Sequence, residues 1–177
     1  MTERQLIEGC KRGDAKALKQ LYETFAGKMF GVCYRYAGNR ETARDLLHDG
    51  FVTLYTKIGD FRGDGSFEGW VRRIFVTTAL GYLRKNGSVW DERPADEMYG
   101  LQGDEPSALE RLSAEDLLRV IGRLPAGYRT VLNLYAVEGY SHREIAEMLH
   151  ISENTSRSQY SRARSQLCRL LEQVNSV

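Results

Sequence analysis

The stretch SHREIAEMLHISENTSRSQYSRARSQLCR, residues 141–169, combines two helical patterns with a short break between them. Ser141 and Glu144 have the spacing of a capping box, which favours the start of a helix at this point. Residues 150–152 form the break, and their serine can cap a second helix. A tight turn between two such helices is typical of a helix-turn-helix, whose second helix enters the major groove of DNA.

Short polar side chains begin the second helix of this pair, and arginines follow them. Polar side chains of this size can donate to base edges, and cations suit phosphates or guanines. The alternative is an ordinary solvated helix face, but such faces usually mix lysine with glutamate, and residues 157–169 contain four arginines and no acid. The residues expected to contact DNA are Asn154, Thr155, Ser156, Arg157, Ser158, Gln159, Arg162 and Arg164.

His150 occupies the turn position that commonly holds glycine in such motifs. If the backbone of this residue has a positive φ, the imidazole side chain adds a small strain.

Apolar residues spaced three or four apart predict that the N-terminal half is also helical. We expect helices over about Glu3–Arg12, Ala15–Ala37, Arg40–Ile58 and Ser66–Lys85. The buried stripe of the second consists of Leu18, Leu21, Tyr22, Phe25, Met29, Val32, Cys33 and Tyr36. Gly38-Asn39 favours the end of that helix, because both residues tolerate the left-handed conformation. Gly50 should weaken the third helix by about 1 kcal/mol relative to alanine.

An acidic connector separates two mildly basic blocks. Residues 91–116 contain nine Asp and Glu against two Arg, whereas residues 1–90 and 117–177 both carry a net positive charge. We therefore expect an all-α chain of two small helical domains, residues 1–86 and 107–177, joined by a flexible linker over 87–106. The acidity of the linker serves solvation or competes with DNA for a basic surface.

Two further helices are expected ahead of the helix-turn-helix. Leu109, Leu112, Leu117, Val120, Ile121 and Leu124 predict an amphipathic helix that starts near Pro106 and ends at Pro125-Ala-Gly127. The next helix is expected over Tyr128–Val137.

Composition excludes several classes of protein. No run of about 18 apolar residues is present, so membrane insertion is not expected, and the charged N-terminus lacks a secretory signal, which predicts a cytoplasmic protein. Three widely spaced cysteines and three histidines without ligand spacing predict neither a disulfide framework nor a metal site. No nucleophile–base arrangement or phosphate-binding glycine loop indicates an enzyme, and no cofactor is expected.

Several segments resemble one known family, the extracytoplasmic-function sigma factors of bacterial RNA polymerase. The helix-turn-helix, together with Leu124-Pro-Ala-Gly-Tyr-Arg-Thr-Val131, resembles their region four. Ala43-Arg-Asp-Leu-Leu-His-Asp-Gly-Phe51 resembles the region-two helix that docks on the polymerase. Phe61-Arg-Gly and Phe67-Glu-Gly-Trp-Val-Arg-Arg-Ile74 through Lys85 resemble the promoter-melting segment. The resemblance covers nearly the whole chain except the connector.

The resemblance implies a subunit that binds core RNA polymerase, directs it to promoter DNA and opens the duplex. Region four would contact the upstream (−35) element. The clamp helices of the largest polymerase subunit would bind Asp45, His48 and Asp49, which share one helix face, and the polymerase flap is a further expected contact. Melting would use stacking and phosphate contacts. The expected melting residues are Phe61, Arg62, Asp64, Ser66, Trp70, Arg72, Arg73, Thr77, Arg84 and Lys85, although helix-spaced Phe61 and Trp70 also fit core positions.

Two residues of the melting segment depart from the family pattern. Thr77 stands where relatives commonly have Asn, and Gly81 where they commonly have Asp. Thr has only a hydroxyl and Gly has no side chain, so we hypothesise relaxed reading of the downstream (−10) element. Placement on the promoter would then depend on region four or on a separate DNA-targeting partner.

Other functions remain open at this point. The chain could instead be a conventional helix-turn-helix repressor or activator, whose N-terminal helices dimerise or bind an effector and whose site is palindromic. Family members are commonly held inactive by an anti-sigma protein, which makes such a protein a further possible partner.

Overall fold

The computed structural model describes residues 1–86 and 113–175, and every regular element in these two ranges is a helix. The predicted all-α fold class is therefore confirmed. The chain divides into two compact units, Met1–Tyr82 and Leu83–Val177. The predicted linker, residues 87–106, lies outside the described residues.

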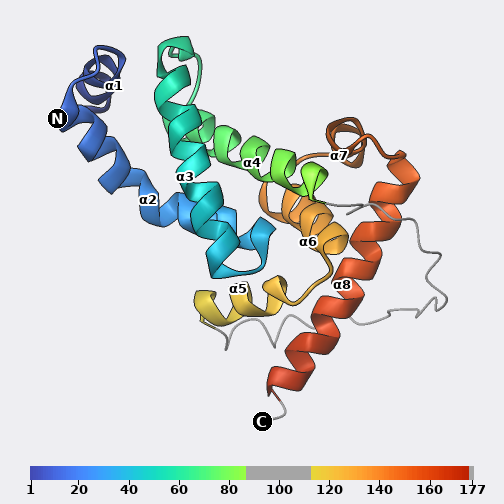
Figure 1. Ribbon diagram of the computed structural model, residues 1–177. Coiled ribbons are helices and arrows are strands. Elements are labelled where there is room, and N and C mark those ends of the chain that lie inside the picture. The colour runs from blue at the N-terminus through green and yellow to red at the C-terminus, as the bar shows by residue number, and fades with distance from the viewer. Residues whose placement is uncertain (87–112, 176–177) are drawn as a thin grey trace. The chain divides into compact units, whose positions relative to one another are not determined.

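Four α-helices and one short 3-10 helix build the first unit. They are α1 (Glu3–Lys11), α2 (Ala15–Ala37), α3 (Arg40–Lys57), η1 (Ile58–Asp60) and α4 (Phe67–Lys85). The long helices α2 and α3 pack against each other (Figure 1). The carboxylate of Asp14 caps α2 by accepting from the backbone N–H of Lys16 and Ala17, and Gly38 ends it with a φ of 76°. The helix end predicted at Gly38 is confirmed.

Aromatic side chains join the three long helices of this unit. Phe51 of α3 meets Phe75 of α4 edge-on, with 5.2 Å between ring centroids, and Phe25 of α2 meets Phe67 at 5.8 Å. Tyr22, which was predicted in the buried stripe of α2, is instead 46% exposed. It lies at the edge of that stripe, where its ring covers Phe51 at 4.7 Å while its other face meets solvent.

Gly50 of α3 lies against the Phe75 ring of α4. A Cβ at this position would be 2.3 Å from two ring carbons of Phe75, and that ring is fully buried. A glycine inside the helix reduces its intrinsic stability, but here it makes room for the aromatic ring.

The second unit contains α5 (Ala114–Gly122), α6 (Ala126–Leu132), the π-helix η3 (Asn133–Val137), α7 (His142–Leu149) and α8 (Glu153–Asn175). Its core combines Leu124, Leu132 and Ala163, and partly buried residues of α6 and α8 surround them. Buried Arg129 donates from Nη1 to the carbonyls of Gly122 and Leu124, which ties the end of α5 to α6.

Two predicted helices of this unit have different limits. Ser113 has extended backbone and caps α5, so the helix predicted from Pro106 does not continue through it; Leu109 and Leu112 lie outside the described residues. Pro125 is the N-cap of α6, whereas it was interpreted as a terminator. Proline is tolerated at a helix start because its missing N–H has no partner there.

Candidate nucleic-acid interface

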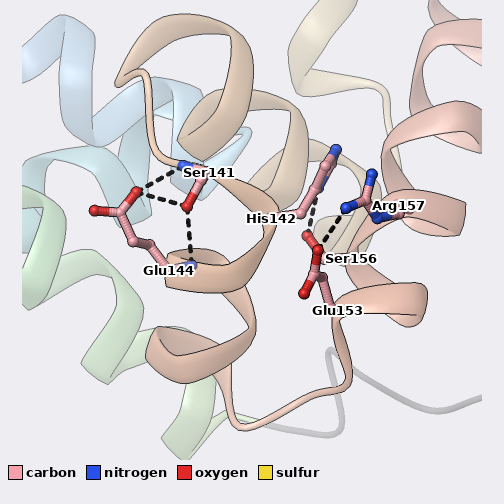
Figure 2. Close-up of polar contacts among 6 residues, drawn as sticks. All are labelled: Ser141, His142, Glu144, Glu153, Ser156 and Arg157. Carbon is pink, nitrogen blue, oxygen red and sulfur yellow. Dashed lines mark hydrogen bonds and ion pairs between the residues drawn. The ribbon is translucent and has the colours of Figure 1, made fainter.

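The capping box at the start of α7 is present as predicted. Ser141 Oγ accepts from the backbone N–H of Glu144 at 3.2 Å, and a carboxylate oxygen of Glu144 accepts from the backbone N–H of Ser141 at 2.8 Å (Figure 2). These bonds satisfy backbone donors that the first turn of a helix otherwise leaves without a partner.

The turn between α7 and α8 contains a residue with left-handed backbone, His150, for which the sequence left the sign of φ open. His150 has φ 55° and ψ 43°, and it is the one residue other than glycine with a positive φ in the described ranges. The backbone N–H of Ile151 then bonds the carbonyl of Ala146 at 3.1 Å. Ser152 Oγ accepts from the backbone N–H of Thr155 at 3.0 Å, so Ser152 caps α8 as predicted.

A polar and aromatic contact set joins α7 to α8. His142 Nδ1 lies 2.9 Å from Ser156 Oγ (Figure 2), and the imidazole stacks on Tyr135 with 4.3 Å between centroids. Tyr160 meets the edge of the same imidazole at 5.8 Å. Burial lowers the pKa of His142, and the nearby Arg157 guanidinium lowers it further, against the opposing effect of Glu153. The imidazole is therefore held neutral, and Nδ1 can accept the Ser156 hydroxyl proton.

Burial divides the predicted DNA-contacting residues of α8 into two groups. Those exposed to solvent are Asn154, Arg157, Ser158 and Arg164, and Thr155 and Arg162 are half-buried. Ser156 is fully buried and Gln159 is 8% exposed, so neither side chain faces the surface that DNA would approach. Ser156 instead bonds His142 and fixes the angle between the two helices.

A signal in the sequence could have identified this inner face. Ala163, Leu167 and Leu170 pack inward. Counting back from Ala163 in steps of four and three reaches Gln159 and Ser156. Because both are polar, neither marks a buried face by itself.

Two arginines on α8 have partners within the helix. The Arg157 guanidinium donates to Glu153 at 2.5 Å (Figure 2), and the Arg164 guanidinium lies 6.0 Å from the centre of the Tyr160 ring. Glu153 was not among the predicted site residues.

In the first unit, the loop between η1 and α4 holds the first of the predicted melting residues, and α4 holds the others. Gly63 and Gly65 have φ of 86° and 91°, and Arg62, Asp64 and Ser66 are exposed. Lys11 reaches this loop, because its ammonium donates to the carbonyl of Phe61 at 3.1 Å.

The aromatic residues of this segment pack on one another. Phe61 is 7% exposed, and its ring lies 5.1 Å from Phe67 and 5.3 Å from Trp70. Trp70 is half-buried. Phe61 therefore packs at the base of the loop, in agreement with the core alternative given for it, and Trp70 is the more accessible ring.

The outer face of α4 carries the remaining predicted melting residues. Arg73, Thr77, Arg84 and Lys85 are exposed, and Arg72 is half-buried. A Cβ at Gly81 would meet no atom within 4 Å. Near its start, α4 is tied to α2 by an ion pair of 2.8 Å between Lys28 and Glu68.

Asp45, His48 and Asp49 are all exposed on α3, on one face as predicted. An open pocket of about 480 Å³ adjoins His48. It is lined by Tyr22, Phe30, Arg44, Leu47, His48, Phe51, Val52 and Tyr55. Val52 is 51% exposed, an apolar contribution that the polar pattern of the sequence did not indicate.

No group of three His, Cys, Asp or Glu residues in the described ranges could hold a metal ion. None of the described helices is both long enough and apolar enough to cross a membrane.

Comparison with known proteins gives this geometry a family. The model of sigma-70 region 2 matches residues 21–89, and that of sigma-70 region 4 matches residues 114–167. The RNA polymerase sigma-H factor of Pseudomonas aeruginosa is 30% identical over 185 aligned positions, covering 96% of this chain and 94% of the relative. The chain belongs to the sigma-70 family.

Within the sigma-70 family, the relatives include extracytoplasmic-function members. The sigma-E factor of Haemophilus influenzae, of this group, is 31% identical over 179 positions and is covered over 94% of both chains. The resemblance stated from the sequence motifs is thus confirmed.

Two solved structures share the fold, and one of them is of a sigma factor. CnrH, in complex with the cytosolic domain of CnrY, gives a TM-score of 0.52 at 23% identity and is covered over 97% of its chain and 96% of this one. RpoE of Bartonella quintana, in complex with the anti-sigma factor NepR, gives a TM-score of 0.53 at 22% identity. The match covers 98% of the RpoE chain and 89% of this one.

Proposed function

We propose that this sigma factor binds core RNA polymerase through the exposed face of α3, opens promoter DNA with the loop at 61–66 and α4, and reads the upstream element with α8. The arrangement of exposed and buried residues on α8 is the observation that supports DNA binding. Its exposed N-terminal turns present Asn154, Arg157 and Ser158, while the bond from His142 to Ser156 fixes the helix from behind. A recognition helix needs this combination of exposed donors and fixed orientation.

The proposed domains are residues 1–86 for region two and 107–177 for region four, with 87–106 between them. The sigma-70 region 2 and region 4 matches support the order of these functions along the chain. The chain supplies recognition and binding, and the polymerase supplies the catalysis. Because the function is exercised on polymerase, we place it in the cytoplasm.

A pull-down on core RNA polymerase without DNA tests the proposal against a conventional helix-turn-helix regulator. We expect the full chain to be retained by core polymerase, and charge reversal at Asp45 and Asp49 to reduce retention at least tenfold. Arg40→Ala, also exposed near the start of α3, provides a matched control. If the chain binds DNA but not the core enzyme, the regulator is the correct interpretation.

The upstream contact has its own test. Arg157→Ala should weaken binding of the polymerase complex to upstream-element DNA. The loss should be concentrated on the preferred sequence if Arg157 contacts a base, and equal on all sequences if it contacts phosphate.

An anti-sigma protein is a further proposed partner. Of the solved structures that share the fold, the sigma factor RpoE is bound to the anti-sigma factor NepR, and CnrH is in complex with the cytosolic domain of CnrY. The apolar pocket beside His48 is a suitable docking site, because an inhibitor seated there would cover part of the face that we assign to polymerase. Inhibitor binding and core binding should then be mutually exclusive in a competition experiment.

A further inference from the structure

Glu153 is a carboxylate on a helix face that is otherwise suited to polyanionic DNA. It is the first residue of α8, directly after the capping Ser152, and its side chain is 45% exposed. No other acidic residue occurs in α8 before Glu172. A face that bound only phosphates would gain nothing from this charge, because a carboxylate repels phosphate oxygens.

The carboxylate lies on the part of the helix that would meet base edges. The N-terminal residues of a recognition helix reach furthest into the major groove. Glu153, Asn154 and Arg157 are exposed, whereas Ser156 and Gln159 are buried toward the rest of the unit.

Glu153 also orients the cation beside it. Its Oε1 accepts from Arg157 Nη2 at 2.5 Å, one helical turn away (Figure 2). That contact uses one N–H of a guanidinium that carries five. The Arg157 side chain is 59% exposed, so its other donors remain accessible. A guanidinium held in this way is restricted before DNA arrives, which reduces the entropy lost on binding.

Carboxylate and guanidinium have complementary base preferences. In the major groove a carboxylate accepts from the amino group of cytosine, and arginine donates to O6 and N7 of guanine. Thymine and guanine offer the carboxylate no donor there, and the adenine amino group lies beside the N7 acceptor, which repels a carboxylate, so cytosine is the favoured partner. A Glu–Arg pair one turn apart can therefore read two neighbouring base pairs.

We infer that Glu153 is a specificity-determining residue of α8: it accepts from a cytosine amino group in the upstream element and aims Arg157 at a neighbouring guanine. The inference rests on the proposed function of α8. The same negative charge disfavours DNA that lacks this cytosine, so Glu153 improves discrimination more than affinity.

The test measures base preference with the full chain bound to core RNA polymerase, using duplexes in which the upstream element is randomised. The variants are Glu153→Gln and Glu153→Ala. The matched control is Glu147→Gln, because Glu147 forms an exposed ion pair of the same spacing with Arg143 on α7. Glu153→Gln keeps the length of the side chain, removes its charge and replaces one acceptor oxygen with an NH₂ donor.

We expect both Glu153 variants to lose about tenfold of the preference for cytosine at one position. Their binding to unmatched DNA should rise severalfold, because one repulsive charge is gone. Glu147→Gln should leave the preferred bases unchanged. The guanine preference due to Arg157 should weaken in Glu153→Ala, which cannot orient the guanidinium.

Two outcomes separate the possible failures. If the wild-type complex shows no upstream preference at all, the proposed function of α8 fails. If the wild-type complex shows an upstream preference, and Glu153→Gln has the same preferred base at every position to the same degree, only the inference about Glu153 is overturned. In that case the carboxylate acts only through the helix dipole and its pairing with Arg157.

Discussion

His150 has a left-handed backbone at the turn between α7 and α8, with φ 55° and ψ 43°. For a residue with a Cβ this conformation is less favourable by about 1–2 kcal/mol, and glycine avoids the penalty. The side chain is exposed, so its removal leaves no cavity. The turn therefore carries a strain that no buried contact of the imidazole explains.

His150→Gly should raise the free energy of unfolding of the second unit by about 1 kcal/mol, because the strain is relieved at the small cost of a more flexible unfolded chain. Denaturant unfolding followed by circular dichroism measures it. Gly139→Ala, at a φ of 80°, is the reverse control and should destabilise the same unit. An unchanged or lower midpoint for His150→Gly would refute the strain argument.

His142 makes the second unit sensitive to pH. Burial and Arg157 lower the pKa of its imidazole below the ordinary 6.5, while Glu153 acts in the opposite direction. Tyr135 and Tyr160 are the other titratable groups that face the ring. The unfolded chain therefore takes up the proton at a higher pH than the folded chain does. The stabilising contribution of neutral His142 is complete above pH 6.5 and decreases as the pH falls.

We expect the free energy of unfolding of the second unit to decline as the pH falls below about 6.5, before ordinary carboxylates titrate. His142→Gln should flatten the decline in this window, since an amide oxygen can still accept from Ser156 but does not titrate. A slope that persists in His142→Gln would assign the pH dependence to another group.

At the scale of helices, the close approach of α3 and α4 depends on Gly50. An added methyl group would overlap the fully buried ring of Phe75, at 2.3 Å from two of its carbons. Overpacking of this kind typically costs 1–3 kcal/mol.

Gly50→Ala should lower the free energy of unfolding of the first unit by about 1–3 kcal/mol. Gly27→Ala in α2 is the matched control, because a Cβ there would meet no atom within 4 Å. It should stabilise the unit by roughly 0.5–1 kcal/mol through helix propensity alone. If the two substitutions change the free energy of unfolding equally, helix propensity and not packing against Phe75 determines the effect at Gly50.

Patterns along single helices made most of the fold predictable. The spacing of apolar residues gave the α2 limits, Ala15–Ala37, and local capping chemistry identified Ser141 and Ser152 as helix starts. Contacts between helices were not predictable in this way. The hydrogen bond between His142 Nδ1 and Ser156 Oγ spans fourteen positions. Its serine is buried, although the polar sequence around it predicted an exposed side chain. The close contact of Gly50 with Phe75 likewise depends on packing between two helices.

At the scale of the whole chain, the two units should contribute unequally to promoter selection. The outer face of α4 offers cations for phosphates at Arg73, Arg84 and Lys85, but only a hydroxyl at Thr77 and no side chain at Gly81. Paired donors and acceptors discriminate bases best. The base preferences of the complex should therefore be strongest in the upstream element, which we propose that α8 reads.

Selection of promoters from a library randomised in the downstream element, with core polymerase, should return weak base preferences. Thr77→Asn should sharpen them by adding an amide, and Gly81→Ala, for which there is free space, should not. A strict downstream consensus for the wild-type chain would contradict this division.

The π-helix η3 constrains the length of the chain as well as its composition. The backbone N–H of Glu138 bonds the carbonyl of Asn133 at 2.9 Å, five residues back, so this turn contains one residue more than an α-helical turn. In evolutionary terms it behaves as a single-residue insertion, and each residue of an α-helix turns the chain by about 100°. Substitutions at exposed Ala136 leave that count unchanged, whereas a one-residue deletion would change the direction in which the chain leaves α6. Helices α7 and α8 would then have a different orientation, although none of their own residues had changed. Deletions in this turn should therefore be rarer among functional relatives than substitutions.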